Sequence, residues 1–363
     1  MPRRCDVRRL ATVTYENGLA MQTSLVFMRQ RDQIPDQLLL LQHTPVITTT
    51  RLTPPEHVLV SKDRLKDRGI ALFETNRGGD VTYHGPGQLV GYPLLHLGEG
   101  RRDVRKFVTD IEEVLIRTVA EFGIESSRRD GAHGVWVGDN KIAAIGVRIA
   151  RWVTSHGFAL NVTTDLSAFS TITPCGLSGT GVTSIEHERG SPVPMSEVEE
   201  TLLRHFAEIF ERELHPLEHE IRVVKVVLHD NERFLLLKRL RSAGGFWQPV
   251  TGVIEDGESA REAAVREVLE ETGFASNPSS LGFEQSFLIS PEFLDSKRVQ
   301  PIFADETCFV ARIGRGVEIT LDQEEHEDYG WFTLDEAVKM LKWSDDREAL
   351  ERVARGSLPG TTV

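Results

Sequence analysis

The amino-acid sequence predicts a mixed α/β protein built from two domains. Its 363 residues correspond to about two domains at roughly 150 residues each. Short apolar runs of strand length alternate with stretches whose apolar residues recur at helical spacing. The strongest break between such segments falls at residues 215–220. We therefore expect one domain over residues 1–215 and a second over residues 216–363.

The expected boundary lies between the end of a helix and the start of a hairpin. Ser196 followed by Glu199 is a capping-box pattern, which is typical of a helix start. Apolar residues at helical spacing follow it, and Pro216 marks where that helix must have ended. Residues 221–228 and 234–237 then predict two strands joined by a short turn. The second domain is expected to begin with this hairpin.

The same kinds of signal predict the remaining elements. Asp103 can cap a helix that Gly123 stops. Thr333 followed by Glu336 repeats the capping-box pattern near the end of the chain. Strands are expected at residues 35–42, 46–50, 134–137, 141–149 and 157–162, and a charged helix at residues 259–271.

The composition argues against several classes of function. Acidic residues outnumber basic ones by 55 to 42, which gives a net charge of −13. Nucleic acids and anionic membranes require clustered positive charge, so neither is an expected partner. Three distant cysteines, Cys5, Cys175 and Cys308, cannot build a disulfide framework. No apolar run has the length of a membrane span, and the basic N-terminus lacks the apolar part of a secretory signal. We expect a soluble cytoplasmic protein.

Three carboxylates share one face of the charged helix predicted in the second domain. Glu267, Glu270 and Glu271 stand at positions i, i+3 and i+4. Like charges this close favour a cation between them, and Mg²⁺ or Mn²⁺ suits oxygen ligands. Arg266 is available to orient a carboxylate by bidentate hydrogen bonding. A solvated acidic helix face is the alternative.

The residues around this helix complete a longer motif. Gly252 allows a tight turn ahead of the helix, and Gly273 serves as its C-terminal stop. With Glu258, they fit the spacing G-x5-E-x7-R-E-U-x-E-E-x-G-U at every position. The motif resembles the Nudix box, and the resemblance extends over about residues 220–345. It implies an α/β/α sandwich in which the carboxylate trio holds Mg²⁺ (or Mn²⁺) to hydrolyse a nucleotide-type small molecule. Glu325 is either an additional ligand or base, or part of a solvated loop.

Cys175 is the candidate nucleophile of the first domain. Pro174 and Gly176 on either side of it favour an irregular turn, which presents a side chain rather than burying it in a sheet. A nucleophilic thiol needs a nearby cation or base. Lys141, at the start of an otherwise apolar strand, is the candidate for this role. The alternative is a cysteine that acts only as a small buried apolar residue.

A glycine-rich stretch is the candidate binding loop of the first domain. Four glycines fall among residues 77–88 and permit close backbone approach to a ligand. Arg77, Tyr83 and His84 can hydrogen-bond such a ligand. The stretch matches no phosphate-binding glycine motif. His84 and also His156 are equally well explained as structural histidines.

Four blocks of the first domain together resemble the lipoyl(octanoyl) transferases, also called octanoyl-carrier-protein:protein octanoyltransferases. The blocks are RGGDVTYHGPGQLVGYP, GVWVGDNKIAAIGVRI, HGFALNV and ITPCGLSGTGVTSI, and the resemblance covers about residues 8–214. It implies a fold related to biotin- and lipoate-ligase catalytic domains. The implied reaction needs no cofactor. It moves an octanoyl group from acyl carrier protein to a lysine of the lipoyl domains of 2-oxoacid dehydrogenase and glycine cleavage proteins.

The resemblance also implies roles for individual residues. Cys175 would carry the acyl thioester, while Lys141 would favour its thiolate and later assist deprotonation of the incoming amine. The small pocket residues and Phe158 can line an apolar slot for the acyl chain. An ATP-using lipoate or biotin ligase is the alternative, although such enzymes need no cysteine nucleophile. The expected substrate pocket consists of Arg77, Gly78, Gly79, Asp80, Val81, Thr82, Tyr83, His84, Ala144, Ile145, Gly146, Gly157, Phe158 and Ala159.

Two further features bear on this resemblance. The family usually has a glycine in the turn after its early strand, where this chain has Thr50, so the shape of the pocket wall is expected to differ. Acyl carrier protein and lipoyl domains are typically acidic, so the docking face should be locally basic. A solvated charged surface is the alternative for each basic cluster. The candidate clusters are Arg101, Arg102, Arg105 and Lys106; Arg128 and Arg129; and Arg148 with Arg151.

Overall fold

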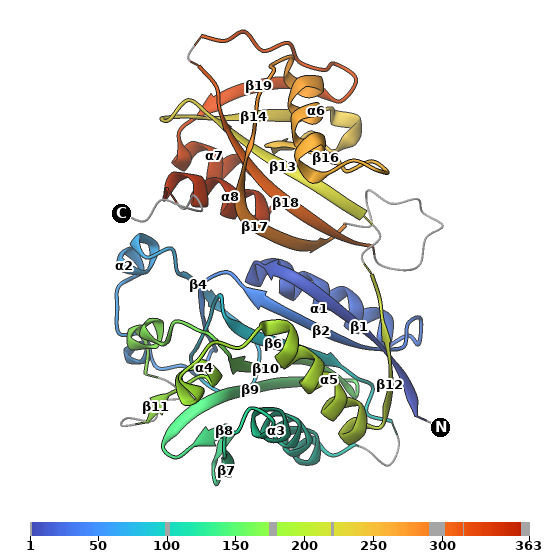
Figure 1. The fold of residues 1–363 in the computed structure, drawn as a ribbon, viewed down its shortest axis with the longest axis vertical. Helices are drawn as coiled ribbons and strands as arrows, with labels where there is room; N and C mark the ends of the chain where they lie inside the picture. The colour runs from blue at the N-terminus through green and yellow to red at the C-terminus, as the bar shows by residue number, and fades with distance from the viewer. Residues whose placement is uncertain are drawn as a thin grey trace. The chain divides into compact units, whose positions relative to one another are not determined.

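The computed structural model describes residues 2–98, 102–173, 180–218, 221–289, 302–314 and 316–356. The chain divides into two units, one formed by Met1–Leu10 with Leu19–Glu218 and the other by Ala11–Gly18 with His219–Val363. Both units mix helices and strands (Figure 1), which confirms the predicted α/β class. No helix in the described part of the chain has the length and apolarity that crossing a membrane requires.

The main sheet of the first unit has the strand order β1-β2-β6-β10-β9-β8-β7. The ladder from β2 to β7 is antiparallel throughout, whereas β12 pairs in parallel with β1, and β11 with β9. The strands are β1 (Arg3–Val13), β2 (Asp36–His43), β6 (Gln88–Leu94), β7 (Ser127–Arg129), β8 (Ala132–Val137), β9 (Asn140–Ala150), β10 (Val153–Asn161), β11 (Gly181–Val182) and β12 (Arg212–Pro216).

A smaller sheet of order β4-β3-β5 lies beside the main one. It consists of β3 (Val46–Thr49), β4 (Ala71–Glu74) and β5 (Thr82–His84), so it carries the end of the glycine-rich loop. The short helices of the unit are η1 (Pro55–His57), α2 (Lys62–Asp67), η2 (Leu166–Thr171) and α4 (Ile185–Arg189).

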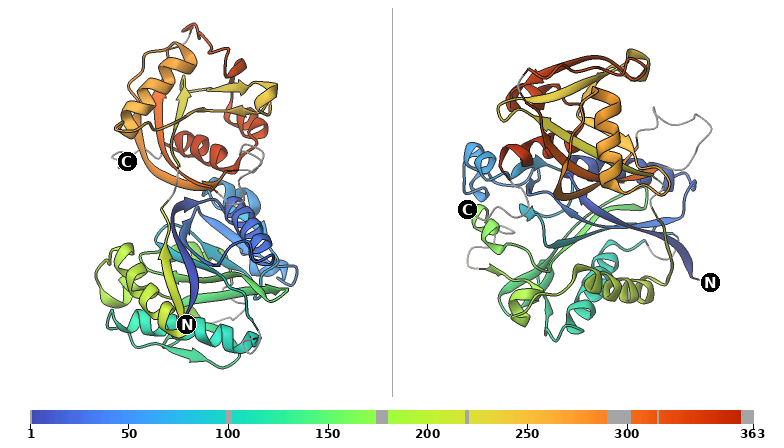
Figure 2. Two further views of the ribbon diagram at one scale, coloured as in Figure 1. Left: turned by 90° about the vertical axis from the view of Figure 1, so that its right-hand side faces the viewer. Right: turned by 45° about the horizontal axis from the view of Figure 1, so that its top comes forward.

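Helices cover both faces of the main sheet. On one face, α3 (Val104–Ala120) and α5 (Met195–Phe210) share a large apolar core with the sheet strands. On the other face lies α1 (Tyr15–Arg29), as the views in Figures 1 and 2 show. Its Gln22 accepts a hydrogen bond from the backbone N–H of His156, at 2.6 Å. A side chain of α1 therefore satisfies a backbone N–H of β10.

The second unit is a three-layer sandwich. Its sheet has the order β15-β14-β13-β18-β17, with β16 added on β13 and β19 on β14. One apolar core lies under α6 and another under α7 and α8, on opposite faces of the sheet. This confirms the expected α/β/α arrangement. The elements are β13 (Ile221–His229), β14 (Phe234–Arg239), η4 (Arg241–Ala243), β15 (Trp247–Gln248), β16 (Val250–Val253), α6 (Ala260–Thr272), β17 (Ser279–Leu288), β18 (Phe303–Arg312), β19 (His326–Phe332), α7 (Leu334–Met340) and α8 (Ser344–Ala354).

Most of the expected helix ends are correct, but one is wrong. The Asp103 side chain accepts a hydrogen bond from the N–H of Lys106, and a capping box forms at Thr333. Gly273 ends α6 in the left-handed conformation, with φ 66°. The capping box expected at Ser196 does not form, because α5 begins at Met195 with Pro194 at its N-cap. Proline already holds a φ suited to the helix entry, so Ser196 falls inside the first turn.

Candidate active sites

The β9–β10 hairpin brings together two of the three-residue blocks expected in the first pocket. Directly opposed residues are Ala144 and Ala159, Ile145 and Phe158, and Gly146 and Gly157. Ile145 and Phe158 belong to the apolar core under α3 and α5. Phe158 is 3% exposed, and its ring occupies the space beside Gly91 of β6. Phe158, which was expected to line an acyl slot, therefore points into the core under α3 and α5. Of these two blocks, only the alanines and glycines face the other side of the sheet.

The glycine-rich loop packs on that same side of β9. The N–H of Gly78 donates to the carbonyl of Val147 at 3.0 Å. A Cβ atom at Gly146 would lie 2.8 Å from the carbonyl oxygen of Gly78, so the contact requires glycine there. Arg77 is fixed by Thr48, whose carbonyl and hydroxyl oxygens accept hydrogen bonds from Nη2 at 2.9 and 2.8 Å. Two separate blocks of the expected pocket are thus joined.

Thr50, which stands where the family usually has glycine, supports this loop. Its hydroxyl donates to the carbonyl oxygen of Gly79 at 3.3 Å, and Gly79 itself has a φ of 88°. Thr50 is not among the residues with a positive φ. The turn therefore needs no glycine at this position, and the side chain supplies a hydrogen bond that glycine lacks.

The rest of the expected loop is buried or half-buried and is held by contacts within the unit. Asp80 Oδ2 lies 2.6 Å from Nδ1 of His57. Val81 packs in a separate apolar cluster, and Thr82 pairs with Thr48 between β5 and β3. These contacts fix the backbone of the loop and leave its turn at Gly78 and Gly79 exposed.

The two ionisable rings at the end of the loop are kept neutral by burial. Burial, with a smaller contribution from Asp165, raises the pKa of Tyr83 to about 12. Burial and the neighbouring His43 lower the pKa of His84 to about 3, and its Nδ1 lies 2.7 Å from Oε1 of Gln88. At neutral pH both side chains are therefore uncharged hydrogen-bonding groups.

Lys141 reaches the pocket side of the sheet through an irregular register between β8 and β9. It pairs with Trp136, whereas Ala143 pairs with Val135, so one extra residue is accommodated between them. Val135 belongs to the apolar core and Trp136 does not, which places Lys141 with Trp136 on the opposite face. Lys141 is 6% exposed, and its Nζ donates to the carbonyl of His133 at 2.9 Å.

Cys175 lies outside the described residues, but the chain on both sides of it is anchored near this pocket. Before it, the N–H of Thr173 donates to the carbonyl of His57 at 2.8 Å. After it, Val182 of β11 pairs with Lys141 of β9. The chain before Cys175 is therefore bonded to His57, which contacts Asp80, and the chain after it is paired with β9, which carries Lys141.

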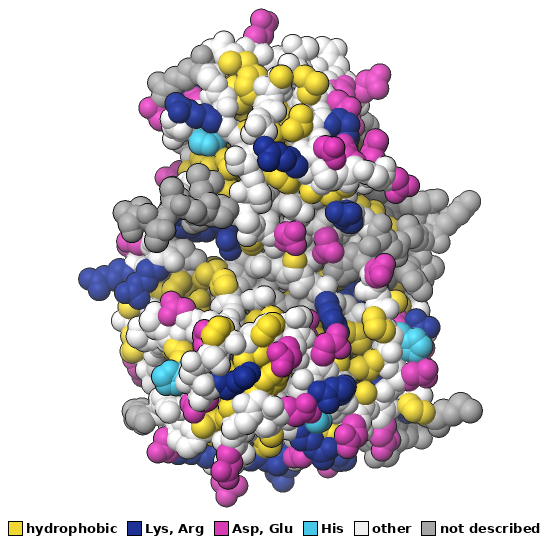
Figure 3. Space-filling model, in the orientation of Figure 1, with side chains coloured by type: hydrophobic (Ala, Val, Ile, Leu, Met, Phe, Trp, Pro, Cys, Tyr) yellow, Lys and Arg dark blue, Asp and Glu magenta, His cyan; other side chains and the backbone are white. Residues whose placement is uncertain are grey.

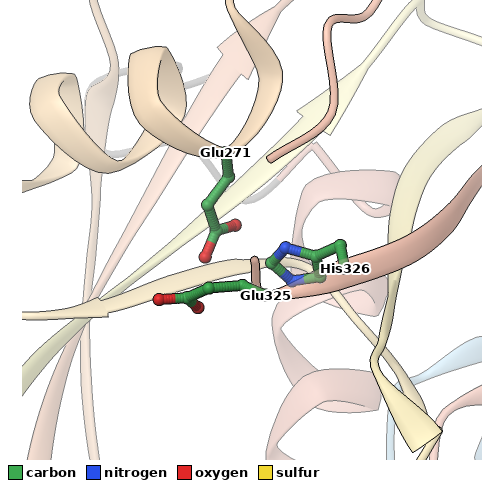
Figure 4. Close-up of side chains that lie close together, drawn as sticks. All are labelled: Glu271, Glu325 and His326. Atoms are coloured by element: carbon green, nitrogen blue, oxygen red, sulfur yellow. The ribbon is translucent and has the colours of Figure 1, made fainter. Parts of the chain in front are cut away.

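The second unit brings a buried carboxylate together with two residues from the start of β19. Ligand atoms of Glu271, Glu325 and His326 lie within 4.8 Å of one another (Figure 4). Neither carboxylate oxygen of Glu271 and neither ring nitrogen of His326 has a hydrogen-bond partner among the described residues. Burial, reinforced by Glu267 and Glu325, raises the pKa of Glu271 well above its usual range. Burial lowers the pKa of His326 to about 4.

Arg266 binds the other carboxylates of the motif. It contacts Glu258 with two hydrogen bonds of 2.9 Å, and reaches Glu267 at 2.7 Å and Glu270 at 2.9 Å. Gly252 was expected to permit a tight turn, but its φ is not positive. A Cβ atom there would lie 1.8 Å from the carboxyl carbon of Glu267. Glycine is therefore required by the close approach of this side chain rather than by the turn.

A divalent cation fits this cluster. The observation that favours it is the pair of buried Glu271 oxygens, which have no hydrogen-bond donor in the described part of the chain, beside the second acid Glu325. The sequence placed Glu267, Glu270 and Glu271 together, and in the structure Arg266 holds the first two while Glu271 joins Glu325. His326 was not expected as a site residue. Its only signal was its place in the acidic run that contains Glu325.

Comparison with known proteins supports both halves of the chain. The family described as lipoyl protein ligase A/B catalytic domain matches residues 14–207, and the NUDIX domain matches residues 219–353. NUDIX domains are generally dependent on divalent metals. A solved lipoate-protein ligase A bound with ATP has the same fold as the first unit, with a TM-score of 0.50, 17% identity and coverage of 60% of this chain and 90% of that one.

Curated relatives cover nearly the whole chain. An octanoyltransferase from Myxococcus xanthus is 39% identical over 356 residues, which is 95% of this chain and 98% of that protein. An octanoyltransferase from Solibacter usitatus (strain Ellin6076) is 50% identical over 214 residues, 59% of this chain and 96% of the relative. These matches confirm both resemblances seen in the sequence. The chain belongs to the octanoyltransferase family, with a lipoyl protein ligase A/B catalytic domain followed by a NUDIX domain.

Proposed function

We propose that the first domain, residues 1–215, transfers an octanoyl group from octanoyl-acyl carrier protein to a lysine of a lipoyl domain through a thioester on Cys175. The main support is that Lys141, Gly146 and the Arg77 loop lie on the same side of β9. The anchored ends of the segment that contains Cys175 add to this support. The natural acceptors are the lipoyl domains of 2-oxoacid dehydrogenase and glycine cleavage proteins.

The transfer proceeds in two balanced steps. The sulfur of Cys175 attacks the thioester carbonyl, and the carrier leaves as its free thiol after taking up one proton. The acceptor amine then attacks the enzyme thioester, loses a proton and restores the Cys175 thiol. Lys141 is buried and its amine is oriented by the His133 carbonyl, so we assign it both proton transfers. A thiol used in this way must remain reduced, which suits the cytoplasm.

Trapping the acyl-enzyme tests this proposal. Incubation with octanoyl-carrier protein, without acceptor, should add one octanoyl group, and peptide mass spectrometry should find it on Cys175. A Cys175→Ala variant should remain unmodified, while Cys5→Ala, at a cysteine buried outside the pocket, should be acylated normally. An adduct that persists in Cys175→Ala would contradict the assignment. Octanoylation of the acceptor that depends on ATP would instead favour the ligase alternative.

For the second domain, residues 216–363, we propose metal-dependent hydrolysis of a nucleoside diphosphate linked to another group. Mg²⁺ or Mn²⁺ would be held by Glu271 with Glu267, Glu270 and Glu325. When bound, the ion supplies charge that polarises a phosphate and activates water. The unsatisfied oxygens of Glu271 carry this proposal, and Arg266 keeps the neighbouring carboxylates in place.

A nucleotide panel decides between hydrolysis and the alternative of a nucleotide-sensing module. The intact protein is incubated with nucleoside triphosphates, dinucleoside polyphosphates and nucleotide sugars, with Mg²⁺ or with chelator, and phosphate-containing products are measured. Hydrolysis that depends on the metal supports the proposal. Tight binding of one nucleotide without turnover of any would support the sensor.

A further inference from the structure

The turn between β9 and β10 holds two large side chains in a conformation that favours glycine. Arg151 has a φ of 51° and Trp152 a φ of 62°, and the residues on either side of them are directly paired. Two-residue turns of this type are normally Asn-Gly, and a non-glycine residue in the left-handed region is strained. Trp152 is still 37% exposed, so burial within the unit does not account for it. The Trp152 carbonyl accepts a hydrogen bond from the N–H of Leu97 at 2.7 Å, so the fold holds the backbone of this turn while the ring stays on the surface.

Arginine side chains accompany the exposed aromatic rings around this turn. The guanidinium carbon of Arg102, at the start of α3, lies 5.1 Å from the centre of the Trp152 ring. The end of α1 is also adjacent, because Gln30 donates to the backbone carbonyl just before the turn at 2.9 Å. There Arg31 lies 3.3 Å from the centre of the Phe27 ring, which is 52% exposed. Two of the basic clusters noted in the sequence, at Arg102 and at Arg151, therefore meet at one place.

Arg148 links this turn with the pocket. It is exposed and stands two residues from Gly146, so both project from the same face of β9. Within the described part of the chain, Arg102, Arg148 and Arg151 form no ion pair with a carboxylate. We call the group of exposed residues the hairpin surface; it consists of Phe27, Arg31, Arg102, Arg148, Arg151 and Trp152.

We propose that the hairpin surface docks the acyl carrier protein that delivers the octanoyl group. The inference rests on the proposed transferase function and adds the place where the donor binds. Arginines without an ion-pair partner among the described residues, next to exposed aromatic rings, suit an acidic protein partner. Arg148, between the turn and the pocket, is positioned to meet the phosphodiester of the carrier's prosthetic arm.

The distance to the pocket favours the carrier over the lipoyl domain. Ala150, at the turn, is four residues from Gly146, or about 13 Å along the strand. A lysine side chain is too short for this span, so the lipoyl domain must present its lysine closer to the pocket. A phosphopantetheine arm is several times longer than a lysine side chain and can cover it. The acyl end then lies along β9 toward Lys141.

The other basic groups are less suited to this role. Arg128 is bonded to Glu113 at 2.6 Å, and Arg129 to Asp139 at 2.5 Å, so their charges are already compensated. On the face drawn in Figure 3, acidic and basic side chains are intermingled over α5, without a patch of one sign. Arg101, the first residue of the remaining cluster, lies outside the described residues.

The decisive variant is Arg151→Asn combined with Trp152→Gly. It installs the turn sequence that the backbone prefers while it removes both side chains from the hairpin surface. The thermal midpoint should therefore stay equal or rise. With octanoyl-carrier protein as donor, KM should rise roughly tenfold, because a charge and an aromatic anchor are lost, and its dependence on salt should weaken. Arg148→Gln should raise KM in the same direction.

Two controls accompany this experiment. Arg129→Gln removes an equal charge elsewhere and should leave the carrier's KM unchanged. Octanoyl-N-acetylcysteamine, a small donor without a protein, should be used equally well by wild type and double variant. An unchanged carrier KM in the stable double variant, or a rise confined to the KM of the lipoyl domain, would overturn the docking inference. Wild-type protein that transfers octanoyl from neither donor would instead overturn the transferase function on which the inference rests.

Discussion

The two candidate sites differ in how their charged and polar side chains are satisfied. In the first unit, Arg77 is bonded to Thr48, and Lys141 to a backbone carbonyl. In the second unit, Glu271 and His326 are buried beside each other, and their side-chain polar atoms have no hydrogen-bond partner among the described residues. Among the residues that the structure describes, the cationic groups of the first site are thus bonded within the protein, whereas the buried carboxylate of the second site is not.

The difference matches the two chemistries. A covalent transfer needs a nucleophile and a base held in fixed positions, and hydrogen bonds from the fold can supply that order. Phosphate hydrolysis needs strong charge stabilisation, and a divalent cation among carboxylates supplies more charge than side chains alone. Buried carboxylate oxygens without a donor are costly, so they indicate that a ligand belongs there.

The largest expected effect is from Glu271→Gln. The amide keeps the shape of the side chain but removes the anionic oxygens at the centre of the cluster, so metal-dependent hydrolysis should fall by about 1,000-fold or more. Octanoyl transfer should remain unchanged, because its groups are satisfied without the cation. Steady-state rates of both reactions on the intact protein check this. Glu324→Gln, at an exposed neighbour of Glu325, is the matched control. Equal loss of both activities would break the distinction between the sites.

Lys225→Met tests whether a buried charge with partners behaves differently from Glu271. Burial alone would lower the pKa of Lys225, but three carboxylates raise it well above its usual value. The ammonium lies 2.8 Å from Glu306 and 2.7 Å from Asp346. Without this ammonium the buried carboxylates have no opposite charge beside them, so the free energy of unfolding of the second unit should fall by about 3–5 kcal/mol. Urea unfolding at neutral pH measures it.

The control for this change is an ion pair nearer the surface. Lys238 lies 2.6 Å from Glu327, and its side chain is 26% exposed. Lys238→Met should cost under about 1 kcal/mol. Similar losses in the two variants would show that the buried cluster around Lys225 gains nothing from its pairing.

Local patterns in the sequence predicted much of both folds. The strands expected at residues 134–137, 141–149 and 157–162 correspond to β8, β9 and β10, and the hairpin expected after residue 220 corresponds to β13 and β14. The Nudix motif placed its carboxylates on α6 because that motif lies within one helix and its two ends. Features of this kind need only the neighbouring residues.

What the sequence missed depends on contacts between distant segments. The strands β1 and β12 pair with each other across two hundred residues, and neither was expected. The irregular register that turns Lys141 toward the pocket arises from its pairing with β8. The contact of His57 with Asp80 joins η1 to the glycine-rich loop. No periodicity within one segment encodes such contacts.

The pH dependence of stability tests whether the histidines of the first site are neutral structural groups. Burial lowers the pKa of His84 from 6.5 to about 3 and that of His156 from 6.5 to about 4. Above pH 6.5 both are neutral in either state. Below it the unfolded chain takes up protons that the folded unit does not, so each histidine should lower stability by about 1.4 kcal/mol per pH unit until its folded pKa is reached.

Hydrogen exchange of the β6 and β10 amides at pH 7.0 and 5.5 follows the stability of the first unit alone. His84→Gln should make the decrease between the two pH values shallower, because one of the two titrating groups is gone. An unchanged slope in this variant would mean that His84 is protonated in the folded unit as well. The first site would then contain a buried charge, and the contrast with the second site would fail.

The smallest effect is expected at Thr50, which supports the first site through hydrogen bonds of its hydroxyl. The Thr50 hydroxyl donates to Gly79 and also accepts from the N–H of Leu52 at 3.2 Å. Thr50→Gly restores the residue usual in the family but removes both bonds, at a cost of about 1 kcal/mol. Thr50→Ser keeps the hydroxyl and should behave as wild type. Octanoyl transfer by Thr50→Gly should fall about twofold through KM, because the glycine-rich loop becomes less ordered. Faster transfer by the glycine variant would show that the loop works better when it is free to move, and that the first site is less complete than its hydrogen bonds indicate.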